Sequence, residues 1–254
     1  MLHLFTYGVL LAACLGILWG FVRKDHAEYA AFKLLTETAD RQRCYRDWTV
    51  KSFLLFTGST VIVLALLRRF GALIALPNEF HSLSLQLRSQ MPREQLPGRG
   101  FLLGFGFAVF GSMILGGFLA RALARKGDKA KIVTVGDIEP LMPRNGAETG
   151  WTALLSLNAG LSEELFFRML LPLLLVNLLG NARFAFAVAA ILFGLVHFYQ
   201  GAVGVIATMI LGLVFTGLYL WTGNLWIAIG VHAFFDLIGL VVRPTLMRMI
   251  PVKS

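Results

Sequence analysis

Long apolar runs, separated by short polar connections, dominate the chain. Several of them contain no charged residue over roughly 17–21 positions, which is long enough for a helix to cross a bilayer core of about 30 Å. The predicted spans are Leu2–Val22, Ser52–Leu67, Phe101–Ala120, Trp151–Gly180, Phe184–Gln200, Ala202–Trp221 and Asn224–Val242. None shows the alternation of a barrel strand, so helices must satisfy the backbone in lipid. The pattern predicts an all-α polytopic membrane helix bundle of about seven transmembrane helices, within a range of six to eight.

For three segments the pattern allows more than one structure. Ser52–Leu67 is short for a span and can extend past the two arginines that follow it to Pro77. Trp151–Gly180 is long, so its first turns are expected at the interface or in a separate short helix. His81–Ser89 alternates apolar and polar residues, which fits a surface strand or an interfacial segment.

Composition supports the membrane prediction. Hydrophobic residues make up 57% of the 254 positions and charged residues only 15%, with a mean hydropathy of +0.73. A soluble domain of this length would contain about 25% charged residues. The lipid bilayer is therefore the first partner that we expect.

The net charge of +9 does not indicate nucleic acid, because Lys and Arg lie mostly in the connections between spans. With seven spans, the 23–51 loop, the 121–150 loop and the tail after Val242 share one side and hold seven, six and three of them. The other side has five in the 68–100 loop and Arg183. This asymmetry places the N-terminus outside and the C-terminus in the cytosol. The first ten residues contain no Lys or Arg, unlike a signal peptide, and together with the compact membrane core this favours a bacterial cytoplasmic membrane.

Ionisable residues inside the predicted spans are concentrated in the C-terminal hundred residues. The three earlier spans hold almost none. Those from Trp151 onward are Glu163, Glu164, Arg168, His197, His232 and Asp236. Charged groups in hydrocarbon are costly and mark functional sites by default. We therefore expect function in this half and a scaffold or substrate-facing wall in the other.

Helical spacing separates the two glutamates. Glu164 and Arg168 are four residues apart, with the acid first, so they share a helix face and can neutralise each other. This pair is interpreted as structural. Glu163 is left without a local partner, which makes it the candidate general base.

The two histidines have neighbours at the same spacing. Phe193 precedes His197 by four residues, and Asp236 follows His232 by four. With Glu163 these three polar residues can polarise a water, either directly or through a divalent metal such as zinc, for which all four are candidate ligands. Their predicted depths place them in one cytosol-facing cavity.

Three motifs now resemble a known family. "EELFFR" (Glu163, Glu164, Arg168) is similar to the EExxxR motif of the CAAX-processing and bacteriocin-processing intramembrane proteases, the CPBP or Abi family. "FGLVH" is similar to its FxxxH motif and "HAFFD" to its HxxxN or HxxxD motif. Their order and their placement in consecutive apolar helices also match. The resemblance covers roughly residues 151–242.

The resemblance implies an intramembrane endopeptidase that acts on a peptide or protein substrate, which can be membrane-anchored. Glu163 and His197 would activate the attacking water, and His232 and Asp236 would stabilise the oxyanion. Glu164, Arg168 and Phe193 would support the site. Many members have Asn where this chain has Asp236, and an ionised carboxylate cannot donate to an oxyanion, so Asp236 must be protonated, orient His232 or bind a metal.

The chain is thus expected to comprise a transmembrane scaffold with cytosolic loops (1–150), a CPBP-like catalytic core (151–242) and a cytosolic tail (243–254). Two other classes stay open. A proton-coupled carrier would use the same Glu, His and Asp groups along a through-path. A non-catalytic scaffold would retain the fold and bind a partner. The substrate, the oligomeric state and the choice between a metal and a metal-free mechanism do not follow from the sequence.

Overall fold

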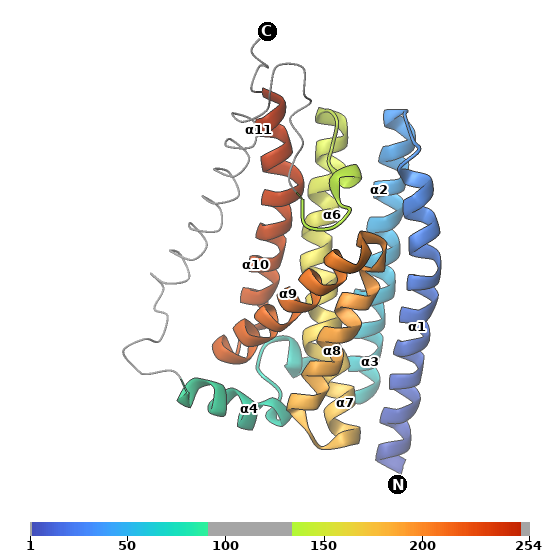
Figure 1. Cartoon of the computed structure of the whole chain (residues 1–254). Coiled ribbons are helices and arrows are strands. Elements are labelled where there is room, and N and C mark those ends of the chain that lie inside the picture. The colour runs from blue at the N-terminus through green and yellow to red at the C-terminus, as the bar shows by residue number, and fades with distance from the viewer. Residues whose placement is uncertain (1, 91–133, 250–254) are drawn as a thin grey trace.

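The computed structural model describes residues 2–90 and 134–249, and every regular element in these ranges is helical. The α-helices are α1 (Leu2–Phe32), α2 (Thr38–Ser52), α3 (Ser59–Leu67), α4 (Asn78–Ser89), α6 (Gly146–Glu164), α7 (Leu171–Leu179), α8 (Ala182–Val196), α9 (Gly201–Thr222), α10 (Leu225–Leu237) and α11 (Arg243–Met249). Three π-helical segments, Phe53–Gly58, Leu165–Leu170 and Ile238–Val242, join α2 to α3, α6 to α7 and α10 to α11. The predicted all-α bundle is confirmed (Figure 1).

Four of the described helical runs are long and apolar enough to cross a membrane, namely Leu4–Phe32, Thr38–Leu67, Phe198–Thr222 and Leu225–Arg248. α8 is a shorter apolar helix of 15 residues. The chain is an integral membrane protein. The predicted span Phe101–Ala120 lies outside the described residues.

The structure resolves the three open segments. The predicted span Trp151–Gly180 lies in one continuous helical run from Gly146 to Leu179 and ends at the C-cap Gly180, so its first turns do not form a separate short helix. The span that was placed at Ser52–Leu67 begins earlier, at Thr38, and ends where Arg68 adopts a left-handed conformation with φ 53°. The strand alternative for residues 81–89 was wrong, because α4 is helical there.

α4 is helical because its apolar residues also repeat at helical spacing. Phe80, Leu83 and Leu87 recur at intervals of three and four and pack against the main hydrophobic core. Phe80 is fully buried, and the Ser84 hydroxyl donates a hydrogen bond of 2.6 Å to the Leu220 carbonyl in α9. Tertiary contacts thus select the helix over the strand that the local alternation also allowed.

The connections between the later helices begin and end on local signals. Asn145, Asn181 and Asn224 cap α6, α8 and α10, each side chain accepting a hydrogen bond from a backbone N–H of the first turn. Gly180 and Gly223 end α7 and α9 in the left-handed conformation that glycine adopts without strain. These caps fix the ends of the helices that contain or border the ionisable residues singled out in the sequence.

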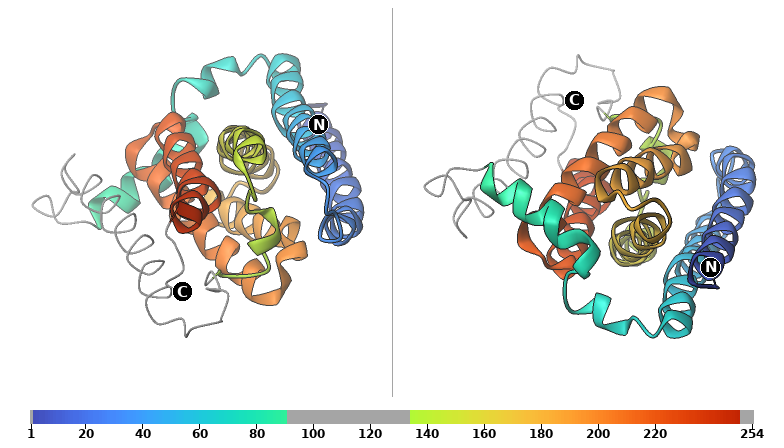
Figure 2. Two further views of the ribbon diagram at one scale, coloured as in Figure 1. Left: turned by 90° about the horizontal axis from the view of Figure 1, so that it is seen from above. Right: turned by 90° about the horizontal axis from the view of Figure 1, so that it is seen from below.

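α6 and α7 run through the middle of the bundle (Figure 2). α2 and α10 contact α6, and α1 and α8 contact α7. The run from Phe166 to Leu174 is almost entirely inaccessible to solvent, which places the charged residues of the preceding turn at the edge of this apolar centre.

A strap, residues 134–145, crosses the end of the bundle near the connection between α1 and α2 (Figure 1). Arg41 of α2 holds it in place. Its Nη2 donates to the carbonyls of Pro140 and Met142 at 2.8 and 3.2 Å, and its Nε donates to the Glu148 carboxylate at 3.1 Å. Arg41 and Glu148 are both buried, so this ion pair and its carbonyl partners satisfy each other away from solvent.

The connection at the opposite end is held by a second ion pair. Arg69 donates two hydrogen bonds of 2.8 Å to Glu79 at the start of α4. These hydrogen bonds lower the pKa of the Glu79 carboxyl.

The junction between α8 and α9 does not reach the end of the bundle. In Figure 1 it lies below the ends of α1 and α6, and α9 then slants across the molecule. The turn Phe198–Gln200 and Gly201 form the junction. Irregular backbone at membrane depth is tolerated only where it is buried or lines a cavity.

Candidate active site

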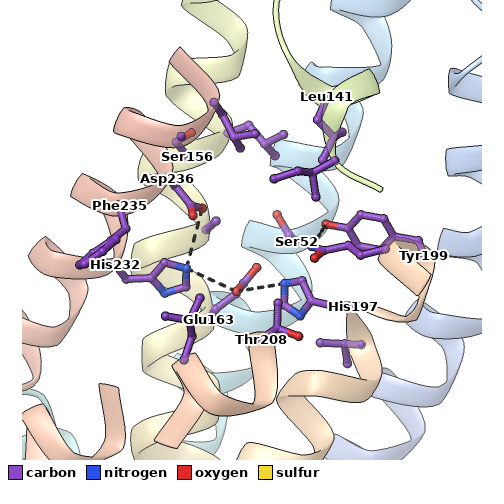
Figure 3. Close-up of a pocket in the computed structure, with 18 of the residues that line it drawn as sticks. Ser52, Leu141, Ser156, Glu163, His197, Tyr199, Thr208, His232, Phe235 and Asp236 are labelled. Carbon is purple, nitrogen blue, oxygen red and sulfur yellow. Dashed lines mark hydrogen bonds and ion pairs between the residues drawn. The ribbon is translucent and has the colours of Figure 1, made fainter. Parts of the chain in front are cut away.

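Four of the residues singled out in the sequence converge at one place (Figure 3). Oε2 of Glu163 lies 3.9 Å from Nε2 of His197 and 3.9 Å from Nε2 of His232. Nε2 of His232 lies 3.8 Å from Oδ2 of Asp236. The structure therefore gathers the predicted base, both histidines and the second acid into one cluster.

The cluster draws on three separate helical runs. Glu163 stands in the last turn of α6, directly before the π-helical segment Leu165–Leu170. His197 is the C-cap of α8, with φ −95° and ψ 21°, a sparsely populated region where active-site residues are often found. His232 and Asp236 lie one turn apart on α10. Helix ends and π-helical segments, both common at functional sites, thus position these side chains.

His232 is oriented by Glu164. Nδ1 of its ring lies 2.7 Å from Oε1 of Glu164. The sequence spacing had suggested Asp236 as the carboxylate beside this ring, but Asp236 lies at the other ring nitrogen and beyond hydrogen-bond distance. Because a carboxylate accepts the Nδ1 proton, the Nε2 atom of His232 faces Glu163 and Asp236.

The predicted pair of Glu164 and Arg168 is present and buried. Nε of Arg168 lies 3.2 Å from Oε2 of Glu164, and the side chains are 1% and 0% exposed. The guanidinium carbon lies 4.0 Å from the centroid of the Phe193 ring and 5.4 Å from that of Phe215. Glu164 neutralises the Arg168 charge and the two rings lie against the guanidinium. These contacts lower the free-energy cost of burying the charge.

His197 is oriented by its own helix. Its Nδ1 lies 2.7 Å from the carbonyl oxygen of Phe193. A carbonyl only accepts hydrogen bonds, so Nδ1 carries the proton and the lone pair of Nε2 faces Glu163. Phe193 therefore contributes to the site through its backbone as well as through its ring.

A cavity of about 500 Å³ opens beside this cluster. It extends from Glu163 to the strap, and its wall is largely apolar. Polar and charged side chains on the wall are those of Asp25, Tyr29, Trp48, Ser52, Thr134, Ser156, Glu163, His197, Tyr199, Gln200, Thr208, His232, Asp236 and Arg243. A pocket of this size with a few convergent polar groups is typical of a binding site for a peptide segment or a small molecule.

The four candidate metal ligands are spaced too widely for zinc as they stand. Two ligand atoms of a tetrahedral zinc, with bonds of about 2.0–2.1 Å, lie about 3.4 Å apart. Here the three measured separations are 3.8–3.9 Å. No group of three or more His, Cys, Asp or Glu side chains in residues 2–90 and 134–249 is arranged to hold a metal ion. The spacing suits a bridging water.

Sequence reasoning missed the polar residues of the cavity wall outside the cluster, among them Asp25, Tyr29 and Arg243. Asp25 and Tyr29 were assigned to a loop, because the apolar run ends at Val22, but α1 continues to Phe32 and brings them to the cavity. Arg243 was assigned to the tail and also reaches the wall. Helical periodicity beyond the last apolar residue was the only signal for these positions.

Residues 145–238 match the sequence profile of one family, described as type II CAAX prenyl endopeptidase Rce1-like. The matched range contains all three motifs and every side chain of the cluster. No curated protein and no solved structure matches the chain. The match confirms the resemblance that the motifs indicated.

Proposed function

From the premise that residues 145–238 match the Rce1-like profile of type II CAAX prenyl endopeptidases, we propose that the chain hydrolyses a peptide bond with a water held between Glu163 and His197. The match supports a CAAX-type intramembrane protease. The roles of individual side chains are our proposal, and one observation supports them above all. Glu163 Oε2 lies 3.9 Å from Nε2 of both histidines, at the wall of a cavity.

Glu163 would act as the general base. Its Oε2 is buried and makes no hydrogen bond within the described part of the chain, so a water is its natural partner. As the water oxygen attacks the scissile carbonyl carbon, one water proton passes to the Glu163 carboxylate. The second water hydrogen is held by the lone pair of His197 Nε2. When the C–N bond breaks, the proton on Glu163 passes to the leaving nitrogen.

His232 would stabilise the oxyanion of the tetrahedral intermediate. It can donate from Nε2 when both ring nitrogens carry protons, with Glu164 accepting the one on Nδ1. Asp236, on the same side of the ring, donates a second hydrogen bond in its protonated form. Donors aimed at the developing charge typically contribute 10²- to 10³-fold each to the rate.

The cavity would open toward the cytosol. It extends to the strap, at the end of the bundle where α1 meets α2, and the excess of Lys and Arg lies on this side. The α8–α9 junction contributes His197, Tyr199 and Gln200 to the wall, and backbone of this kind at membrane depth needs a water-filled or protein-lined space. The attacking water would enter from that end.

A proton-coupled carrier fits this arrangement less well. A carrier needs a path that continues to the other face of the membrane. Beyond the cluster, the side chains from Phe166 to Leu174 are packed and almost inaccessible, and among the described residues the cavity wall extends to the strap. The scaffold alternative gives no reason for an acid without a partner at this depth.

The test is cleavage of a farnesylated peptide ending in a C-a-a-X sequence by the purified protein in liposomes. Glu163→Gln should lower kcat by at least about 10³-fold, because a carboxamide cannot accept the water proton. Glu79→Gln makes the same chemical change in the ion pair at the other end of the bundle and should leave kcat unchanged. Full cleavage by Glu163→Gln would disprove the mechanism, and proton flux that this change abolishes would favour the carrier.

A further inference from the structure

Tyr199 follows His197 by two residues and projects from the α8–α9 junction into the cavity (Figure 3). The centroid of its ring lies 6.0 Å from that of the His197 ring and 4.8 Å from that of the Tyr29 ring in α1. These two ring contacts fix the direction in which the phenol group points. The proposed mechanism gives this group no role.

The phenol group of Tyr199 has an unused donor. Its oxygen accepts a hydrogen bond of 3.1 Å from Nε2 of Gln200, but its own O–H makes no hydrogen bond within residues 2–90 and 134–249. The hydroxyl of Tyr29, on the same wall, instead donates to the Asp137 carbonyl of the strap. A tyrosine hydroxyl in a largely apolar wall usually has a partner. An acceptor on a bound molecule would complete the hydrogen bonding of Tyr199.

Gln200, which orients this phenol oxygen, is itself held in place. Its backbone oxygen accepts a hydrogen bond of 3.0 Å from the Asp137 N–H of the strap. A Cβ added at Gly204 would lie 2.3 Å from the Cβ of Gln200, so the missing side chain at Gly204 leaves the space that Gln200 occupies. The donor of Tyr199 is therefore arranged before any ligand binds, which lowers the cost of binding.

A peptide cleaved at Glu163 would present an acceptor to Tyr199. In Figure 3, His232 and Asp236 lie on one side of Glu163, and His197 and Tyr199 lie on the other. In an extended chain, the carbonyl groups of consecutive residues point to opposite sides. When the scissile oxygen faces His232 and Asp236, the carbonyls before and after it therefore face the side of Tyr199.

We infer that Tyr199 donates a hydrogen bond to a main-chain carbonyl that flanks the scissile one, and so holds the substrate extended across the cluster. This inference rests on the proposed function, since it assumes a peptide cleaved at Glu163. The contact recognises the main chain of the peptide and no particular side chain. It turns the scissile oxygen toward the donors on α10, an effect of orientation on the rate.

The first test removes only the phenol oxygen. Tyr199→Phe retains the ring and should lower kcat/KM for the farnesylated C-a-a-X peptide by about 5- to 100-fold, the range expected when a buried carbonyl loses its donor. Tyr219→Phe is the matched control on α9. The hydroxyl of Tyr219 makes no hydrogen bond within the described part of the chain, and Tyr219 is absent from the cavity wall, so kcat/KM should not change. A Tyr199→Phe variant as active as the wild type would overturn the inference.

The second test removes the acceptor from the substrate. Two analogues each replace one of the amide bonds that flank the scissile bond by a trans-alkene, which keeps the extended shape but has no carbonyl oxygen. The wild-type protein should cleave one analogue about 5- to 100-fold more slowly than the parent peptide, and Tyr199→Phe should cleave that analogue and the parent at equal rates.

Two outcomes of the second test would overturn the inference. The first is wild-type cleavage of both analogues at the rate of the parent peptide, a result that needs no variant. The second is a loss on Tyr199→Phe that is equal for the parent and both analogues, because the phenol group would then act without the carbonyl. A wild-type protein that cleaves no peptide at all would instead count against the proposed function.

Discussion

Glu163 and Glu164 are neighbours in the chain but have opposite surroundings. Glu164 is fully buried and contacts Arg168 and His232. Glu163 is 15% exposed and faces the cavity. We therefore expect Glu164 to contribute to stability and Glu163 to the proposed chemistry. The same substitution at each position separates the two effects.

We expect Glu164→Gln to lower the free energy of unfolding by about 3–5 kcal/mol, because it leaves the Arg168 charge buried without a counterion. Glu163→Gln should change it by less than about 1 kcal/mol, since Oε2 of Glu163 has no hydrogen bond to lose. Thermal unfolding of both variants in the same detergent measures the difference. Equal losses would mean that Glu163 shares the ion pair.

Asp236 offers a second test at the level of single residues. Asp236→Asn should retain cleavage within about tenfold, because an amide donates a hydrogen bond at the same place without requiring a proton. Asp236→Leu should lose about 10²- to 10³-fold in kcat. If Asn is as inactive as Leu, the carboxylate itself is required, and a role as acid or ligand replaces the role as donor.

Predicted depths and the three motifs were sufficient to predict Glu163, His197, His232 and Asp236 as one group, and the structure brings them together. Helical spacing was not sufficient to identify the partner of His232. Glu164 lies 68 positions away in the chain, and contacts between helices depend on rotation and depth, which a local spacing does not specify. Arg243 on the cavity wall was missed for the same reason.

At the level of helices, the site depends on a close contact between α6 and α10. A Cβ added at Gly160 would lie 2.7 Å from the Ala233 backbone nitrogen, a distance that forces the two helices apart. Ala233 neighbours His232, and Gly160 precedes Glu163 by less than one turn. The hydrogen bond between Glu164 and His232 therefore depends on a residue without a side chain.

We expect Gly160→Ala to destabilise the protein by about 1–3 kcal/mol and to lower kcat, because it separates α10 from α6. Gly150→Ala is the matched control on the same helix. Nothing lies within 4 Å of a Cβ there, so it should stabilise the protein by about 0.5–1 kcal/mol. Unfolding and peptide cleavage measured on both variants test this, and an active, stable Gly160→Ala would contradict it.

The strap provides a second prediction for an element. Arg41→Leu should lower the free energy of unfolding by about 3–5 kcal/mol, because it removes the main partner of the buried Glu148 carboxylate. It should also expose residues 134–145 to limited proteolysis. Arg43→Leu on the same helix removes only an exposed pair with Asp40 and should cost less than about 1 kcal/mol. Equal protease resistance of both variants would show that Arg41 does not hold the strap.

The apolar runs predicted the helices but not their ends. Hydropathy falls at the first Lys or Arg, so the first helix was expected to end at Val22. For the same reason the residues of α2 were assigned to the 23–51 loop. In the structure both helices continue beyond the apolar part, because a helix satisfies its backbone equally well in water and in the headgroup region. Between α7 and α8 the helix ends coincide instead with the turn residues Gly180 and Asn181.

For the whole molecule, the orientation in the membrane is the main prediction. Single cysteines replacing Arg43 and Arg183, in a chain with Cys14 and Cys44 changed to Ala, test it with a membrane-impermeant maleimide. Arg43→Cys should react only from the cytosolic side and Arg183→Cys only from the other side, as the charge asymmetry predicts. The reverse result would place the cavity on the outer face.

The short α8 has a consequence for the surrounding lipid. Its 15 residues span about 22 Å, less than the roughly 30 Å thickness of a hydrocarbon core. Phe184, Ile191 and Leu195 project outward along it, so acyl chains beside this helix must shorten or tilt to match it, at a cost of fractions of a kcal/mol per ångström. We expect headgroups and water to approach the His197 end of α8, so that bilayer thickness becomes a determinant of how easily the candidate active site is hydrated.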